Sequence, residues 1–168
     1  MTTTPSFPNR RQLLAGAALG LLPAATLAQM SRPQIRLDSV IPFDTHTWQR
    51  LLDKGPRPAA YLFASMDSPD CERVFGVLRD HVMATRKMAE LVIVMTDAWG
   101  GDALRQARHY LLATRMYAFM GDKDAIRQSV DAHWDGSTPY TVLLEREGPV
   151  HRVTDAPSAS LLQLWLHH

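Results

Sequence analysis

The sequence predicts an α/β domain with a central mixed sheet, flanking helices and a β-hairpin near the C-terminus. Two observations predict this class. Short apolar runs alternate with helical patterns between residues 34 and 132, an order that places parallel strands between crossover helices. Farther on, a turn at 145–148 separates two β-rich runs, 140–144 and 149–153, as in a hairpin. A final helical pattern at 158–166 closes the domain.

The first three elements follow from local patterns. Polar and apolar residues alternate over 34–40, which predicts a half-buried strand. The segment from Thr45 to Lys54 is expected to form a short helix that ends before Gly55. The run 58–64 is almost continuously apolar, which is typical of a central strand buried on both faces.

The middle of the chain predicts two helical regions with a strand between them. Apolar residues recur at four-residue spacing over 69–88, and the five residues 91–95 form a second buried strand. A long helical region is expected from Asp102 to about Ala132. The pair Gly121-Asp122 would divide it, because Gly often closes one helix and Asp often caps the next.

Residues 1–28 have the features of an export signal. Paired arginines, Arg10-Arg11, precede a short apolar run at 13–22, and small residues lead to a cleavage site after Ala28. The run is about half the length that a bilayer requires. The arginine pair resembles a twin-arginine signal, and an ordinary secretory signal is the alternative. Both place the mature domain, residues 29–168, in the periplasm.

The composition of the chain bears on its partners. With 18 Lys and Arg residues against 17 Asp and Glu, the chain is close to neutral and its basic residues are scattered. This pattern does not predict binding to nucleic acid. No apolar segment in the mature chain is long enough to span a membrane. No motif assigns a cofactor.

Cys71 is the only cysteine, and its position makes it the principal candidate for chemistry. It lies at the expected start of a helix, soon after the buried run 58–64. Unpaired N–H groups at a helix start stabilise a thiolate, whereas the adjacent Asp70 and Glu72 favour the neutral thiol. A lone cysteine cannot form an internal disulfide. It is therefore either a small core residue or a thiol that reacts with a partner.

Ser68 precedes Cys71 by three residues and is followed by Pro69. A serine N-cap with proline at the first helical position is a strongly favoured pairing, so we expect Ser68 to cap this helix. A serine hydroxyl is too weak an acid to replace a thiolate without a neighbouring base. No nucleophile motif of the form Gly-x-Ser-x-Gly accompanies it.

The order of the elements and two motifs resemble the thioredoxin-like superfamily over residues 35–167. The segment 63–71 is similar to the strand and loop that read Trp-Cys-Pro-x-Cys in periplasmic proteins of the TlpA and ResA kind. The segment 136–140, Gly-Ser-Thr-Pro-Tyr, is similar to the part of that family around its cis-proline. In this register Ser68 stands in the place of the first, nucleophilic cysteine. Cys71 matches the second, more shielded one.

The resemblance implies a cis peptide bond between Thr138 and Pro139 and a peptide-binding edge beside it. Met66 and Pro69 are expected to belong to the same edge. A backbone left free before a cis-proline would pair with an extended peptide and bring it to the thiol.

The function favoured by the resemblance is extracytoplasmic handling of thiols, disulfides or a metallocentre through Cys71 alone. If the chain is an enzyme, it is expected to act as a monothiol oxidoreductase. The expected partner is a periplasmic protein with thiols or a metallocentre. One alternative is a redox-inactive module that binds a partner. Another resembles the copper-delivering Sco type, with Cys71, Met66 and His133 as weak candidates for soft sulfur and nitrogen ligands to copper(I).

Overall fold

The computed structural model describes residues 37–167 and Met1. The predicted signal segment and the first part of the strand predicted at 34–40 lie outside the described residues. The described elements follow one another as β1 (Ile41–Phe43), α1 (Thr47–Lys54), β2 (Ala59–Ala64), α2 (Pro69–Thr85), β3 (Glu90–Met95), α3 (Gly100–Gln106), a 3-10 turn (Ala107–His109), β4 (Arg115–Phe119), α4 (Lys123–Val130), β5 (Tyr140–Leu144), β6 (Val150–Thr154) and α5 (Ala159–Trp165). Among them, no helix combines the length and apolarity that crossing a bilayer requires.

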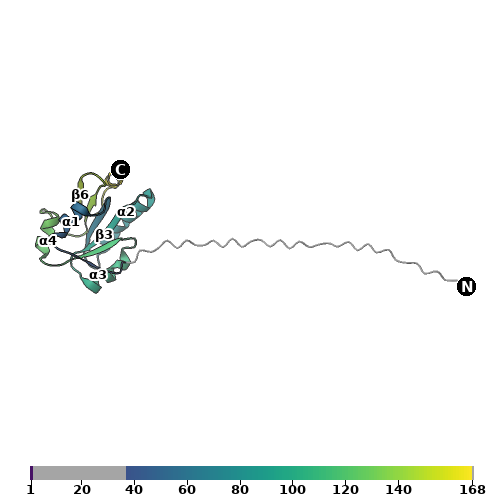
Figure 1. Cartoon of the computed structure of the whole chain (residues 1–168), viewed down its shortest axis with the longest axis horizontal. Coiled ribbons are helices and arrows are strands. Elements are labelled where there is room, and N and C mark those ends of the chain that lie inside the picture. The colour runs from purple at the N-terminus through teal and green to yellow at the C-terminus, as the bar shows by residue number, and fades with distance from the viewer. Residues whose placement is uncertain (2–36, 168) are drawn as a thin grey trace. The chain divides into compact units, whose positions relative to one another are not determined.

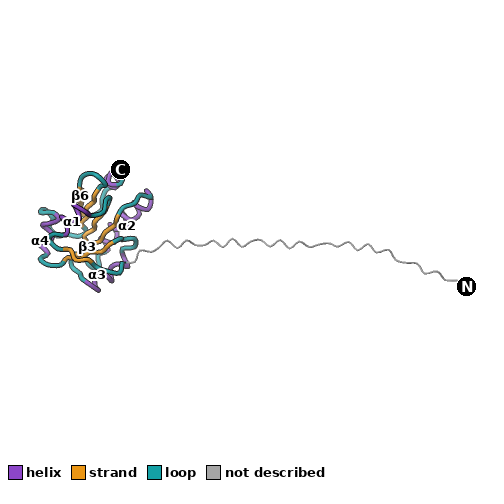
Figure 2. The backbone as a smooth tube through the Cα atoms, viewed as in Figure 1, coloured by secondary structure: helices purple, strands orange, loops and turns teal. Residues whose placement is uncertain are grey.

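The strands form one mixed sheet with the order β1-β4-β3-β2-β5-β6. The first four in this order run parallel to one another, and β5 and β6 form the antiparallel hairpin that ends the sheet. Figures 1 and 2 show the strands at the centre with helices around them. This arrangement is the α/β thioredoxin-like fold predicted from the sequence, with its C-terminal hairpin and flanking helices.

One strand differs from the sequence prediction. Residues Arg115–Phe119 form β4, although the whole region from Asp102 to Ala132 is predicted to be helical. The strand lies between β1 and β3, where its central residues are buried. Pairing with two neighbours therefore outweighs the local helix propensity of this segment. The predicted cap is confirmed, because the Asp122 side chain accepts hydrogen bonds from two backbone N–H groups of α4.

The first strand lies later in the chain than predicted. Residues 37–40 form no strand, and β1 begins at Ile41. Pro42 lies within β1 and pairs in register with Ala118 of β4. Proline is tolerated there because β1 is an edge strand, with a neighbour on one side alone among the strands that the structure describes.

The sheet separates two apolar cores, because successive side chains of each strand point to opposite faces. Leu62 of β2 belongs to the core that α2 and α5 cover. Its neighbours Tyr61 and Phe63 belong to the core that α1 and α4 cover. Every residue of β2 is buried, as predicted for a central strand. Cys71 lies in the first of these cores.

Candidate functional site

The first turn of α2 is built as predicted. Ser68 is the N-cap, with extended backbone, and Pro69 occupies the start of the helix. The Ser68 hydroxyl oxygen accepts a hydrogen bond from the backbone N–H of Cys71, with 3.3 Å between the two atoms. The hydroxyl therefore stabilises the helix end, and one of its lone pairs is engaged in doing so.

The thiol of Cys71 is enclosed in the core. Its side chain is 0% exposed and it forms no disulfide. The surrounding core includes Val74, Phe75 and Tyr110. Burial raises the pKa of the Tyr110 hydroxyl, and the nearby Cys71 sulfur adds to this effect. The sulfur thus has apolar and aromatic neighbours and no exposed surface.

A polar network holds the loop between β2 and α2. The carboxylate of Asp97 accepts a hydrogen bond from the backbone N–H of Met66 at 2.9 Å. Gln106 donates to the carboxylate of Asp67 at 3.0 Å. Asp67 has a φ of 50°, in the left-handed region that Asp adopts more readily than most residues. The Met66 side chain, in contrast, is exposed.

The Thr138–Pro139 loop lies directly beside that loop. The bond between the two residues is cis, as the resemblance implied. The hydroxyl oxygens of Ser65 and Thr138 are 2.9 Å apart, which joins the end of β2 to the start of β5. The carbonyl of Pro139 accepts a hydrogen bond from the N–H of Asp155 at 3.2 Å. Within residues 37–167, however, the backbone N–H and C=O of Thr138 have no hydrogen-bond partner.

A second network positions this loop from the other face of the sheet. The rings of Trp134 and Tyr140 stack 4.5 Å apart, and the Trp134 indole donates to the carbonyl of Ser137. The Tyr140 hydroxyl donates to Asp131 at 2.6 Å. That hydrogen bond, with a smaller contribution from the N–H of His133, lowers the pKa of Asp131. These contacts were not predicted, because no local motif links an aspartate to an aromatic ring nine residues later.

The three weak metal candidates occupy different environments. Cys71 is enclosed, whereas the His133 side chain is 96% exposed and lies 3.4 Å from the Asp131 carboxylate. In the described part of the chain, no group of three or more His, Cys, Asp or Glu side chains is arranged to hold a metal ion. Met66, the third candidate, is exposed.

Comparisons with known proteins extend to the fold alone. No protein-family model matches the chain, and no curated protein does. Among solved structures, it is similar to a secreted disulfide oxidoreductase of Mycobacterium tuberculosis homologous to E. coli DsbE, at 20% identity and a TM-score of 0.47 over 66% of this chain and 81% of that one. It is also similar to the thioredoxin domain of a Bacteroides vulgatus thiol-disulfide oxidoreductase, at 18% identity and a TM-score of 0.45 over 67% and 78%.

Proposed function

We propose that this chain is an exported thioredoxin-fold protein that binds an extended segment of a periplasmic partner at the Thr138 edge, without thiol-disulfide exchange of its own. The observation that carries the proposal is the backbone of Thr138 beside Ser65, which has no hydrogen-bond partner within residues 37–167, at a place where the only thiol of the chain is enclosed. Of the functions that the sequence suggested, this is the redox-inactive, partner-binding one.

The open backbone at Thr138 suits strand addition. An extended peptide laid beside this residue would satisfy its N–H and C=O, at about 1 kcal/mol for each hydrogen bond. Thr138 and Pro139 are half-buried, and Met66 is exposed nearby in the neighbouring loop. The peptide would therefore gain apolar contact as well as backbone pairing.

The enclosed thiol disfavours the single-thiol function. Thiol exchange requires a thiolate that a partner's sulfur can reach in line. Cys71 would have to become accessible through local opening of the first turn of α2. Thiol handling and copper(I) binding through Cys71 stay predictions that depend on such opening.

The test is a peptide-binding measurement on the full chain by nuclear magnetic resonance. The probe is a short capped peptide in which Val and Ser alternate, so that it is extended and uncharged. We expect its addition to shift the Thr138 amide signal and slow the exchange of that amide. Val142, which is already paired on both sides within the sheet, is the internal control.

The same titration on Cys71→Ala separates binding from thiol chemistry. We expect the dissociation constant of this variant to stay within about twofold of the wild type, a change of less than about 0.5 kcal/mol. Loss of binding in Cys71→Ala with the fold retained, or shifts confined to residues far from Thr138, would contradict the proposal.

A further inference from the structure

Three large apolar side chains are exposed at one end of the sheet. Met66, Trp99 and Met120 follow the carboxyl ends of β2, β3 and β4, and their exposed fractions are 40%, 44% and 55%. We refer to these three residues as the apolar row. Because β2, β3 and β4 are adjacent parallel strands, their carboxyl ends meet at one edge of the sheet.

The strand registers place the two methionines of the row at one level of the sheet. Met95 of β3 pairs with Ala64 of β2 on one side and with Ala118 of β4 on the other. Met66 and Met120 each follow their paired residue by two positions, so they extend to the same level on either side of β3. The edge that carries the open backbone of Thr138 thus continues into the apolar row through the neighbouring strand β2.

This edge is also acidic. The segments at this end of the sheet, including the first turns of the helices that begin there, carry ten of the thirteen aspartates in the chain. Several of these carboxylates pair with arginines, but four of them form no ion pair with any residue in the described range. One of the four, on Asp135, accepts a hydrogen bond from the backbone N–H of Ser137. The other three are on Asp67, Asp97 and Asp122. All three are exposed, and each lies within two residues of a member of the apolar row.

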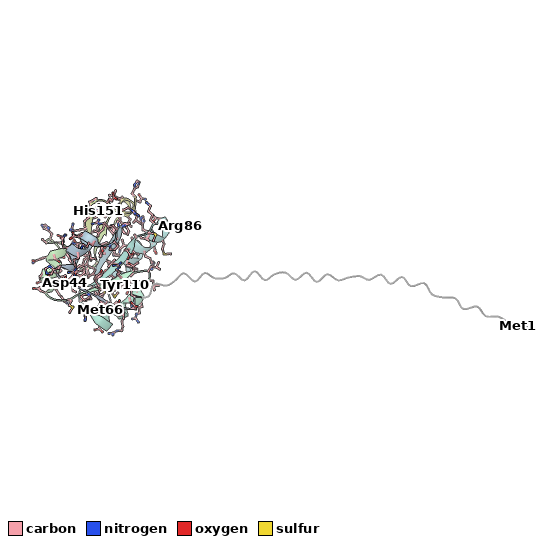
Figure 3. The ribbon with its side chains drawn as sticks, in the orientation of Figure 1. Met1, Asp44, Met66, Arg86, Tyr110 and His151 are labelled. Atoms are coloured by element: carbon pink, nitrogen blue, oxygen red, sulfur yellow. The ribbon has the colours of Figure 1, made fainter. Side chains whose placement is uncertain are left out.

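The other end of the domain carries charges of both signs, among them the exposed carboxylate of Glu147 in the turn between β5 and β6. Arg86 and Lys87 follow the last turn of α2, and Arg146 lies in the turn between β5 and β6. Figure 3 shows Met66 and Arg86 toward opposite ends of the folded domain. Most aspartates of the chain therefore lie, together with one exposed lysine, Lys123, at the edge where exposed apolar side chains occur beside the backbone of Thr138, which is unpaired within residues 37–167.

We infer that the segment bound at this edge is basic as well as apolar: an extended stretch of a partner protein in which Lys or Arg alternates with large apolar side chains. This inference rests on the proposed function and names the partner's chemistry. The apolar side chains contact the row, and the cations lie beside Asp67, Asp97 and Asp122. Complementary charge accelerates encounter and selects among partners, while apolar burial supplies most of the affinity.

The test compares three capped peptides of equal length on the full chain by fluorescence anisotropy. In each, Leu alternates with Lys, Glu or Ser. We expect the Lys peptide to bind about ten times more tightly than the Glu peptide at low salt, with the Ser peptide between them. The difference should shrink at high salt, because screening acts on exposed charges.

Two triple variants test whether the preference for the Lys peptide comes from the three unpaired aspartates. Asp67→Asn, Asp97→Asn and Asp122→Asn together keep one hydrogen-bonding oxygen at each position and should bring the Lys and Glu peptides within about threefold of each other. The matched control, Asp53→Asn, Asp80→Asn and Glu147→Gln, removes as much charge from exposed positions elsewhere and should leave the preference unchanged.

Each outcome decides a separate claim. Equal binding of all three peptides would overturn the charge preference and leave the proposed function standing. Failure of all three to bind would overturn both. A dimer that the first triple variant dissociates would assign the edge to a second copy of the chain. Binding that appears solely after removal of residues 1–28 would assign it to the chain's own N-terminal segment, and either result would overturn the inference.

Discussion

The enclosed side chain of Cys71 makes its two smallest replacements informative. Cys71→Ala removes one buried sulfur and should lower the free energy of unfolding by about 1 kcal/mol. Cys71→Ser places a hydroxyl among apolar neighbours and should cost a further 1–3 kcal/mol or so. Urea denaturation of both variants checks this order. A serine variant as stable as the alanine variant would show that water reaches this position despite its burial.

The hydrogen bond between Tyr140 and Asp131 predicts a dependence of stability on pH. This bond is the largest cause that holds the pKa of Asp131 below its ordinary value of 3.8. A carboxyl group with a lower pKa in the folded state contributes stability above the pKa of the unfolded state. That contribution is lost as the pH falls through the folded-state value.

Tyr140→Phe should therefore lower the free energy of unfolding by about 1 kcal/mol at neutral pH. The difference from wild type should fade in the acid range, once Asp131 is protonated in both states. Tyr61→Phe is the control, because the Tyr61 hydroxyl is buried without a hydrogen-bond partner among residues 37–167. Denaturation curves across the acid range would contradict the account if both variants showed the same pH dependence.

At the scale of elements, the start of α2 offers a direct comparison with the start of α5. Ser68 and Ser158 are both N-caps, and each accepts a hydrogen bond from the backbone N–H three residues later, at 3.3 Å. Alanine at either position should lower the free energy of unfolding by about 1 kcal/mol. Thermal or urea unfolding measures both. A loss at Ser158 alone would mean that Ser68 is not needed as a cap.

The predicted and observed elements differ where pairing with neighbouring strands determines the secondary structure. The two-sided burial of β2 and the cap of α2 could be predicted, because each depends on a pattern within a short stretch of sequence. Strand β4 was missed because Met116 and Ala118 have good helix propensity and no glycine or proline separates the strand from the preceding helix. Its strand conformation depends on pairing with β1 and β3.

The same distinction holds for the candidate site. The sequence predicted the Ser68 cap, and the resemblance implied the cis bond before Pro139. It did not predict the contact of Asp97 with Met66 or that of Asp131 with Tyr140. These pairs are joined by the fold, 31 and 9 residues apart in the chain. Contacts between residues this far apart in the chain produce no local sequence pattern from which they could be predicted.

At the scale of the whole molecule, the fold should still support dithiol chemistry if the missing thiol is restored. Ser68→Cys places a second sulfur at the helix start, three residues before Cys71. We expect the oxidised variant to lose both free thiols to an internal disulfide and to regain them on reduction, as thiol titration would measure. A variant that keeps two free thiols after oxidation would show that the alignment of Ser68 with the family's first cysteine is wrong.

The central claim is that the chain acts through a binding edge while its only thiol stays enclosed. The most direct test is the rate at which iodoacetamide alkylates Cys71 in the folded full chain, compared with the same chain unfolded in urea. We predict folded-state labelling at least about a hundredfold slower, since it would require local opening of the core. Folded-state labelling as fast as in urea would contradict the claim and would indicate that Cys71 is a reactive thiol in the folded chain.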